Sequence, residues 1–377
     1  MFFLPLSMAI PNILLVLIFI LFILQRKNTI WFSNYIRVAF AFGCISLFKD
    51  ILLTEQPNDI TEYKFSLLLI FVLVVGINIH NYIWLEIGFV LGTLSAVFRA
   101  IYRIVNYYFL NDVIPFGNSS GINDLIIIDR PYIGFMCVIS IIFLSKFMKL
   151  RKNVRTNVLF TLCQIILVTF IYLITARLAL MMICCYFTLI VFKKRNFKKI
   201  KTWGVCIFCL GLIFLLGNKN IKERFYVGGS IKTTVNKLKD YEPRFTIWKC
   251  GFEQQKFDSF SLLFGFTEIK EVQKNLLQCY YEIIDKKSKR DYYLKMNFNM
   301  HNQFLDVFLK NGLLGLSLFL CLCFFWFFKK KISFEQRIVI FFTIIFLTIE
   351  NLLNRQLGTY LLIFLIPFKY KKKIDND

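Results

Sequence analysis

His301 is the residue in this chain best suited to proton transfer, and it is one of two histidines. The pKa of imidazole lies near neutrality, so His301 can act as a general acid or base. A lone histidine beside an asparagine, here Asn302, is more often structural or exposed, and that alternative stays open. The other histidine, His80, falls in a short turn that we predict to be cytoplasmic.

Four arginines are further candidates for functional roles. Arg177 lies between two apolar runs, and an arginine at membrane depth is costly unless it is paired or functional. Its alternative role is an interfacial anchor that extends to the lipid headgroups. Arg99 and Arg103 are four residues apart, so they share a helix face and either anchor it or bind an anion. Arg244 follows a proline that starts a helix and shares a face with Trp248, although a surface position is the default for such an arginine.

Neither the acidic residues nor the cysteines predict a metal site. Asp375 and Asp377 form a D-x-D, but they follow a lysine run at the carboxyl end and are expected to be a solvated tail. Cys206 and Cys209 form a C-x-x-C that lacks a second pair and nearby histidines.

Two other pairs have structural interpretations. Glu350 and Arg355 are five residues apart in a late span, which favours a buried ion pair over catalysis. Cys250 and Cys279 could form a disulfide, although the sequence does not place their alpha carbons.

The elements that must position these residues are membrane helices. Of the 377 residues, 57% are hydrophobic and only 18% are charged, which disfavours a soluble globular enzyme. The pattern predicts an all-α polytopic bundle of about eleven spans, within a range of about ten to twelve. The apolar runs lie at 4–24, 31–53, 64–80, 82–105, 132–147, 156–175, 178–192, 202–217, 313–328, 337–353 and 356–368.

The charges predict how the chain crosses the membrane. The formal net charge of +23 falls mostly in short basic clusters between apolar runs, so it indicates orientation rather than nucleic-acid binding. By the positive-inside rule the clusters at 146–155, 193–201, 329–337 and 369–373 are cytoplasmic, which places the amino terminus outside. The first span lacks a basic leader and a cleavage site, so we expect a retained helix.

Three parts follow from this topology: a bundle at 1–217, an extracytoplasmic loop domain at 218–312, and final helices with a basic tail at 313–377. In the loop domain, apolar residues at spacings of three and four predict an amphipathic helix at 267–285. A second helix is expected after Pro243, and a third from His301 to a stop at Asn311-Gly312.

Several motifs in order resemble the O-antigen polymerase and O-antigen ligase family of bacterial envelope proteins. The resemblance covers roughly residues 90–330 and rests on the large outer loop between Arg177 and His301. The matching stretches are Leu173-Ile-Thr-Ala-Arg177-Leu-Ala-Leu, Glu242-Pro-Arg244-Phe-Thr-Ile-Trp248, Leu263-Phe-Gly265, His301-Asn302-Gln-Phe-Leu and Asn311-Gly312-Leu-Leu-Gly315-Leu. Lys310 departs from the pattern, since relatives often have an acid there, and a second glycine after Gly265 is missing.

The resemblance implies a fold similar to the integral-membrane GT-C-like glycosyltransferases and a substrate glycan carried on undecaprenyl diphosphate. It also implies that Arg177 and Arg244 bind the diphosphate and that His301 is catalytic. Guanidinium groups suit a leaving diphosphate, so neither a metal nor another cofactor is expected. For substrate binding we expect Arg99, Arg103, Trp248 and Asn302.

The predicted function is an inverting polysaccharide polymerase of O-antigen or capsule repeat units in the bacterial inner membrane, with its site on the periplasmic side. Its partners are the lipid-linked oligosaccharide, membrane lipid and a protein that regulates chain length, and nucleic acid is not expected. The close alternative is an O-antigen ligase that transfers glycan to lipid A core. A flippase of lipid-linked glycans is more distant, because transporters often have two related halves. A structural or receptor protein is the remaining alternative.

Overall fold

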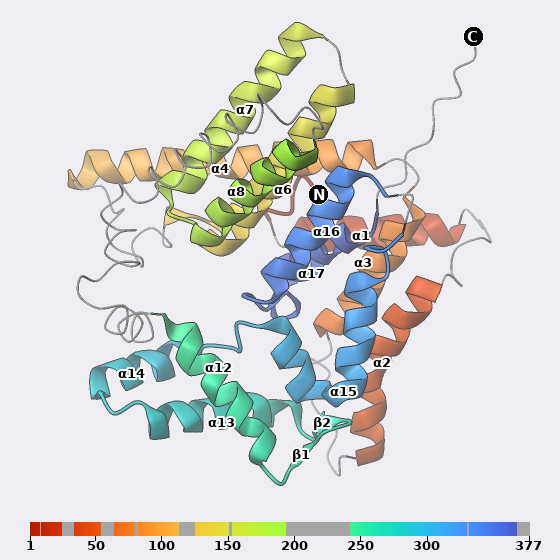
Figure 1. The fold of residues 1–377 in the computed structure, drawn as a ribbon, viewed down its shortest axis with the longest axis vertical. Helices are drawn as coiled ribbons and strands as arrows, with labels where there is room; N and C mark the ends of the chain where they lie inside the picture. The colour runs from red at the N-terminus through yellow and green to blue at the C-terminus, as the bar shows by residue number, and fades with distance from the viewer. Residues whose placement is uncertain are drawn as a thin grey trace. The chain divides into compact units, whose positions relative to one another are not determined.

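The computed structural model describes residues 1–7, 9–24, 34–53, 64–79, 82–112, 125–150, 153–193, 242–329 and 332–367. These residues form helices and one small two-stranded sheet (Figure 1). The chain divides into two compact units, of which the first contains residues 1–11 and 81–241 and the second 12–80 and 242–377. The helical architecture confirms the predicted all-α class.

Four helices are long and apolar enough to cross a membrane within the described ranges. They are α4 (Ile83–Asn111), α6 (Arg130–Leu150), α7 (Val154–Leu173) and α15 (Gln303–Phe324). Shorter apolar stretches occur in α1 (Ala9–Leu24), α2 (Asn34–Leu53) and α3 (Lys64–Asn78). These helices confirm a membrane protein, whereas the number of about eleven spans stays a prediction. The apolar run at 202–217 lies outside the described residues.

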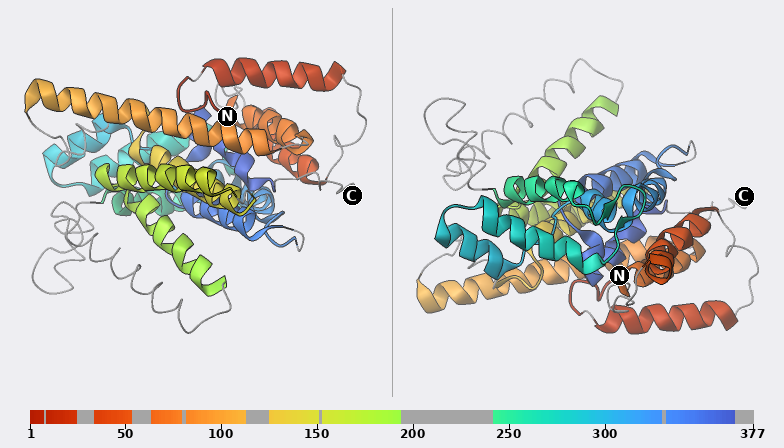
Figure 2. Two further views of the ribbon diagram at one scale, coloured as in Figure 1. Left: turned by 90° about the horizontal axis from the view of Figure 1, so that it is seen from above. Right: turned by 90° about the horizontal axis from the view of Figure 1, so that it is seen from below.

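In the first unit, α6 is the most buried helix. Its residues from Tyr132 to Leu144 are buried without interruption, as expected for a helix that is apolar on all sides. It packs against α4, α7 and α8 (Arg177–Lys193). In both views of Figure 2, α4 is the long straight helix, and it has 29 residues.

Two contacts in the first unit bring its helices together. At Gly134 of α6, an added Cβ would lie 2.9 Å from the Cβ of Ala176 and 3.0 Å from that of Ala179, so glycine permits the close approach of α8. A buried ion pair of 2.9 Å joins Lys146 of α6 to Glu86 of α4. Each buried charge is thereby compensated inside the apolar unit.

The second unit combines α1 to α3 with the carboxyl-terminal third of the chain. Here α15 packs against α2, α2 against α3, and α3 against α17. The remaining elements are α12 (Pro243–Glu253), η3 (Gln254–Lys256), β1 (Phe260–Ser261), β2 (Gly265–Phe266), α13 (Ile269–Ile283), α14 (Lys287–Met296), α16 (Phe334–Leu347), η4 (Leu352–Asn354), α17 (Gln356–Leu361) and η5 (Leu362–Leu365).

The amphipathic helix expected at 267–285 is α13. Its buried residues are Ile269, Val272, Leu276 and Tyr280, which follow the predicted spacing of three and four. Val272, Leu276 and Tyr280 join a hydrophobic core with residues of α12 and α15. This core packs α12 and α15 against α13. Arg244 lies in α12, and His301 lies just before α15.

The expected stop at Asn311-Gly312 is a break in α15, and a second helical segment, within the apolar run predicted from residue 313, follows it to Phe324. At the break, Gly312 has φ of 62° and ψ of −162°. The tip of the β1–β2 hairpin occupies the break, and its Leu262 and Leu263 carbonyls accept hydrogen bonds of 2.9 and 3.2 Å from the amides of Leu313 and Leu314. An added Cβ at Gly312 would lie 2.2 Å from the Leu263 carbonyl carbon, so this contact requires glycine.

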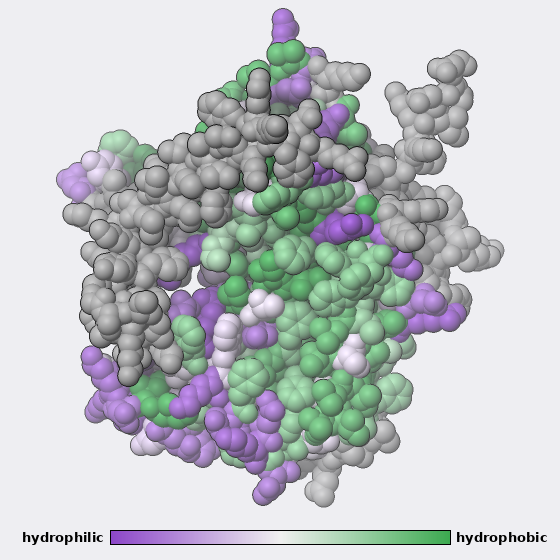
Figure 3. Space-filling model, viewed as in Figure 1, coloured by the Kyte–Doolittle hydropathy of each residue, from purple (hydrophilic) through white to green (hydrophobic). Residues whose placement is uncertain are grey.

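The second unit has surfaces of different character. In Figure 3, hydrophilic residues gather over α12 and α14, and hydrophobic residues cover the face over α15 and α16. Exposed apolar side chains on α15 and α16 include Leu313, Leu314, Leu320 and Phe341. This division is expected where a water-facing segment joins helices that face lipid.

Candidate active site

Glu350 joins Arg244 to His301. One carboxylate oxygen of Glu350 lies 2.6 Å from Nη2 of Arg244, and the other lies 3.2 Å from Nδ1 of His301. The Glu350 side chain is 7% exposed, whereas those of Arg244 and His301 are 26% and 22% exposed. A buried carboxylate thus holds two partners that solvent and ligands can reach.

Each of these residues lies at the end of a helix. Arg244 is in the first turn of α12. Pro243 is the first residue of this helix, where a backbone N–H would have no acceptor within the helix, so proline is tolerated there. His301 precedes the amino-terminal cap of α15, and Glu350 follows the carboxyl end of α16. Helix ends are suitable positions for active-site residues, because the helix holds the backbone rigid while the side chain stays accessible at its end.

The backbone of His301 is held in an uncommon conformation. Its φ of 44° is in the left-handed region, which histidine enters more often than most residues. The His301 amide donates to the side chain of Asn299 at 3.1 Å, and its carbonyl accepts from the Trp248 indole at 3.3 Å. The Phe298 ring lies 5.8 Å from the imidazole, between ring centroids. Several contacts therefore fix the imidazole in place.

Arg244 is held mainly by protein acceptors. Besides Glu350, its guanidinium donates to Glu242 at 2.6 Å and to the Ile349 carbonyl at 3.3 Å. These three hydrogen bonds use three of its five N–H donors, which leaves two for a ligand. Two carboxylates face this one guanidinium, so an incoming anion must compete with them.

The pKa values follow from these contacts. Burial alone would raise the pKa of the Glu350 carboxyl, but the hydrogen bond from His301 and the charge and hydrogen bond of Arg244 outweigh it and hold the pKa below its ordinary value. Burial alone would lower the pKa of Arg244, yet the neighbouring Glu350 and Glu242 raise it. At neutral pH the pair is therefore a carboxylate and a guanidinium.

This arrangement suits general base catalysis. A carboxylate at Nδ1 fixes the orientation and tautomer of an imidazole, so that the other nitrogen, Nε2, can take a proton. The second carboxylate oxygen of Glu350 is held by Arg244, which prevents the carboxylate from turning away from His301. Glu350 is thus a positioning residue for His301.

Glu350 was expected to pair with Arg355, but its two oxygens contact Arg244 and His301 instead. The expectation followed the short separation in sequence, whereas Arg244 is 106 residues away and His301 is 49. A carboxylate in an otherwise apolar late span is the signal that could have identified Glu350 as a site residue.

Trp248 and Asn302 have structural contacts in the site. Trp248 holds the His301 carbonyl, as described above. The Asn302 side chain caps α15 by accepting a hydrogen bond of 3.1 Å from the Leu305 amide. Both residues therefore position His301, and their contact with substrate stays a prediction.

The other predicted site residues belong to the first unit. Arg177 is the first residue of α8, directly after the turn expected between two apolar helices, and it is half-buried. Arg99 is exposed on α4 and Arg103 is half-buried one turn further along. Their arrangement around the substrate stays a prediction. His80, Cys206, Cys209 and the D-x-D tail lie outside the described residues.

A disulfide braces the helix that carries Arg244. Cys250 of α12 and Cys279 of α13 are bonded, with alpha carbons 5.7 Å apart. This distance meets the geometric requirement that the sequence left open. Across the described ranges, no group of three or more His, Cys, Asp or Glu side chains could hold a metal ion.

Comparison with known families agrees with the motifs. A family model described as O-antigen ligase matches residues 159–320, a range that contains Arg177, Arg244 and His301. Glu350 follows the matched range in the sequence. No curated protein and no solved structure matches the chain. This match supports the resemblance to the O-antigen polymerase and ligase family that the motifs predict.

Proposed function

We propose that this protein is a polysaccharide polymerase that transfers a glycan from undecaprenyl diphosphate to a sugar hydroxyl of a second lipid-linked repeat unit. The observation that carries the proposal is the contact of Glu350 with both His301 and Arg244. It supplies a positioned base beside a guanidinium, and glycan transfer from a diphosphate needs both.

In the proposed reaction, the acceptor hydroxyl oxygen attacks the anomeric carbon from the face opposite the diphosphate. The bond from this carbon to the diphosphate oxygen breaks, and its electron pair leaves with the diphosphate. The hydroxyl proton passes to Nε2 of His301, while Glu350 retains its contact with Nδ1. One displacement inverts the configuration at the anomeric carbon.

The leaving diphosphate gains negative charge, which the arginines are proposed to stabilise. Arg244 offers its two remaining N–H donors, and Arg177 is the second proposed partner from the first unit. Planar guanidinium groups bind phosphate oxygens with paired hydrogen bonds, which a lysine cannot reproduce. The periplasmic location of this chemistry is part of the proposal.

The ligase is the second candidate, because the matching family model is described as an O-antigen ligase. The two reactions differ only in the acceptor. In nanodiscs, purified protein with lipid-linked repeat units alone should give a ladder of glycan lengths if it is a polymerase. Transfer only after addition of lipid A core would identify a ligase and contradict our proposal.

The site is tested with variants in the same assay. His301→Ala should lower turnover at least about a hundredfold, since general base catalysis contributes about a hundred- to ten-thousandfold, with little loss of lipid-substrate binding. Arg177→Ala and Arg244→Ala should abolish extension, and Arg→Lys should restore little of it. The exposed Lys274→Gln is the control. Unchanged turnover in His301→Ala would contradict the assignment of the base.

A further inference from the structure

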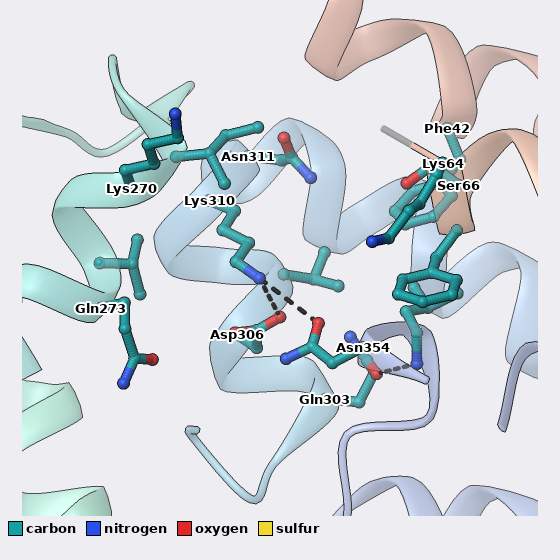
Figure 4. Close-up of a pocket in the computed structure, with 15 residues that line it drawn as sticks. Phe42, Lys64, Ser66, Lys270, Gln273, Gln303, Asp306, Lys310, Asn311 and Asn354 are labelled. Carbon is teal, nitrogen blue, oxygen red and sulfur yellow. Dashed lines mark hydrogen bonds and ion pairs between the residues drawn. The ribbon is translucent and has the colours of Figure 1, made fainter. Parts of the chain in front are cut away.

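A second polar cavity lies in the second unit, and the proposed reaction does not yet use it. Its volume is about 450 Å³, which is within the range of small-molecule sites. It is formed by the start of α3, the start of α13, α15 and the segment at 353–354 (Figure 4). Phe42 of α2 adds an aromatic side chain to the lining.

The charge of this cavity is positive. Three lysines line it, Lys64, Lys270 and Lys310, against one carboxylate, Asp306. Lys310 is 2.9 Å from Asp306 and 3.4 Å from Asn354, so these two groups neutralise and hold it. Throughout the described ranges, neither Lys64 nor Lys270 forms an ion pair. In Figure 4 they come from opposite sides of the cavity.

The neutral part of the lining suits a sugar. The Gln273 side-chain oxygen can accept a hydrogen bond, while its amide nitrogen already donates to Asn297 and Phe298. The Asn354 side-chain nitrogen can donate one, while its oxygen accepts from Lys310. The Phe65 ring holds the Lys64 ammonium over its face, with Nζ 5.0 Å from the ring centroid, whereas Phe42 is 2% exposed. The two amide groups, together with two ammonium groups that have no carboxylate partner in the described ranges, favour a sugar that carries an anionic substituent.

The segments that line the cavity also carry the candidate base and its positioning residue. Gln303 lies two residues after His301, and Leu353 lies three after Glu350. The Leu353 amide donates to the buried Gln303 side chain at 2.7 Å, which joins the two segments directly. The cavity is therefore built on the same backbone as the proposed active site.

We propose that this cavity binds an acidic sugar residue of the glycan, with its carboxylate between Lys64 and Lys270. The inference rests on the proposed function, and it adds that the polymer contains anionic sugars. Lys310 contributes its paired ammonium to the wall of the cavity. The two rim lysines would then select among repeat units by charge.

Binding of short oligosaccharides to the purified full-length protein tests this proposal without any turnover. Trigalacturonate should bind at least about tenfold more tightly than the neutral galactotriose, because charge-assisted hydrogen bonds add this much. The preference should disappear in Lys64→Gln/Lys270→Gln and persist in Lys274→Gln/Lys287→Gln, a control with the same charge loss at exposed positions outside the cavity. Added salt should weaken binding of trigalacturonate but not of galactotriose.

Equal affinity for the two oligosaccharides, or an unchanged preference in Lys64→Gln/Lys270→Gln, would overturn the proposal. Inorganic pyrophosphate is a second probe. If it binds the cavity more tightly than trigalacturonate and loses affinity with the same two lysines, the cavity is a phosphate site instead. Arg244→Ala should stop glycan transfer without changing trigalacturonate binding, so failure of the proposed reaction and failure of the sugar site give different results.

Discussion

Glu350 divides its two carboxylate oxygens between a guanidinium and an imidazole, so a change in one partner affects the other. The residue types and motifs made Arg244 and His301 recognisable in the sequence. Glu350 was not recognised as their partner, because contacts across 106 and 49 residues depend on packing that local spacing does not encode. The long separation also explains why the nearer Arg355 was expected instead.

Acidification should weaken the fold through Glu350. Its pKa is below the ordinary value, so the stability that this carboxylate contributes is present above the ordinary glutamate pKa and is lost as pH falls through the lowered one. Thermal unfolding of the purified protein, followed by tryptophan fluorescence, should show a steeper loss of stability at acidic pH than in Glu350→Gln. Parallel pH profiles in the two proteins would contradict this role of Glu350.

Glu242 should compete with the diphosphate for Arg244. Glu242→Gln removes one of the two carboxylates that face the guanidinium, so the variant should bind the lipid-linked donor more tightly, by about threefold to tenfold. The measurement is the Michaelis constant for the donor at fixed acceptor concentration. Weaker donor binding in Glu242→Gln would mean that Glu242 orients Arg244 for the ligand.

At the scale of elements, the amphipathic pattern predicted α13 closely, and Pro243 marked the start of α12. Periodicity works here because one face of α13 is buried and the other is exposed. The expected stop at Asn311-Gly312 is a break in α15, and a second helical segment follows it directly. The sequence did not reveal that a hairpin 50 residues upstream supplies the missing hydrogen-bond acceptors.

Gly312→Ala should destabilise the protein by at least about 2 kcal/mol, because it forces a side chain into a left-handed position and against the hairpin backbone. The measurement is the midpoint of thermal unfolding in detergent. Gly88→Ala is the matched control, because its Cβ would meet only ordinary contacts at 3.6 and 3.9 Å. Similar midpoints for the two variants would show that the hairpin does not depend on this glycine.

For the whole molecule, composition was enough to predict a helical membrane protein, and ordered motifs were enough to predict the family model that matches residues 159–320. Composition and motif order both depend on many residues, so one misinterpreted residue has little effect on either prediction. The number of spans was harder to predict, because several apolar helices are shorter than a straight span requires. The acceptor of the glycan could not be predicted either, because polymerases and ligases share every motif that we recognised.

The predicted topology places the segment around α13 outside and the end of α6 inside. In intact spheroplasts, a membrane-impermeant maleimide should label Lys274→Cys, and it should label Lys149→Cys only after permeabilisation. Both positions are exposed, and a variant that lacks every cysteine outside the Cys250–Cys279 disulfide provides a clean background. If only Lys149→Cys were labelled in intact spheroplasts, the orientation of the protein in the membrane would be the opposite of the predicted one.

Glu350 follows Arg244 by 106 residues and His301 by 49, so it is the last of these three residues of the proposed site to be synthesised. A nascent chain emerges from the ribosome with Arg244 and His301 long before the residue that holds them together. Until the translocon has released the last helices, the imidazole lacks the anchor that orients it. The proposed glycan transfer would therefore require synthesis through Glu350, and a chain that terminates before this residue would lack the group that orients His301.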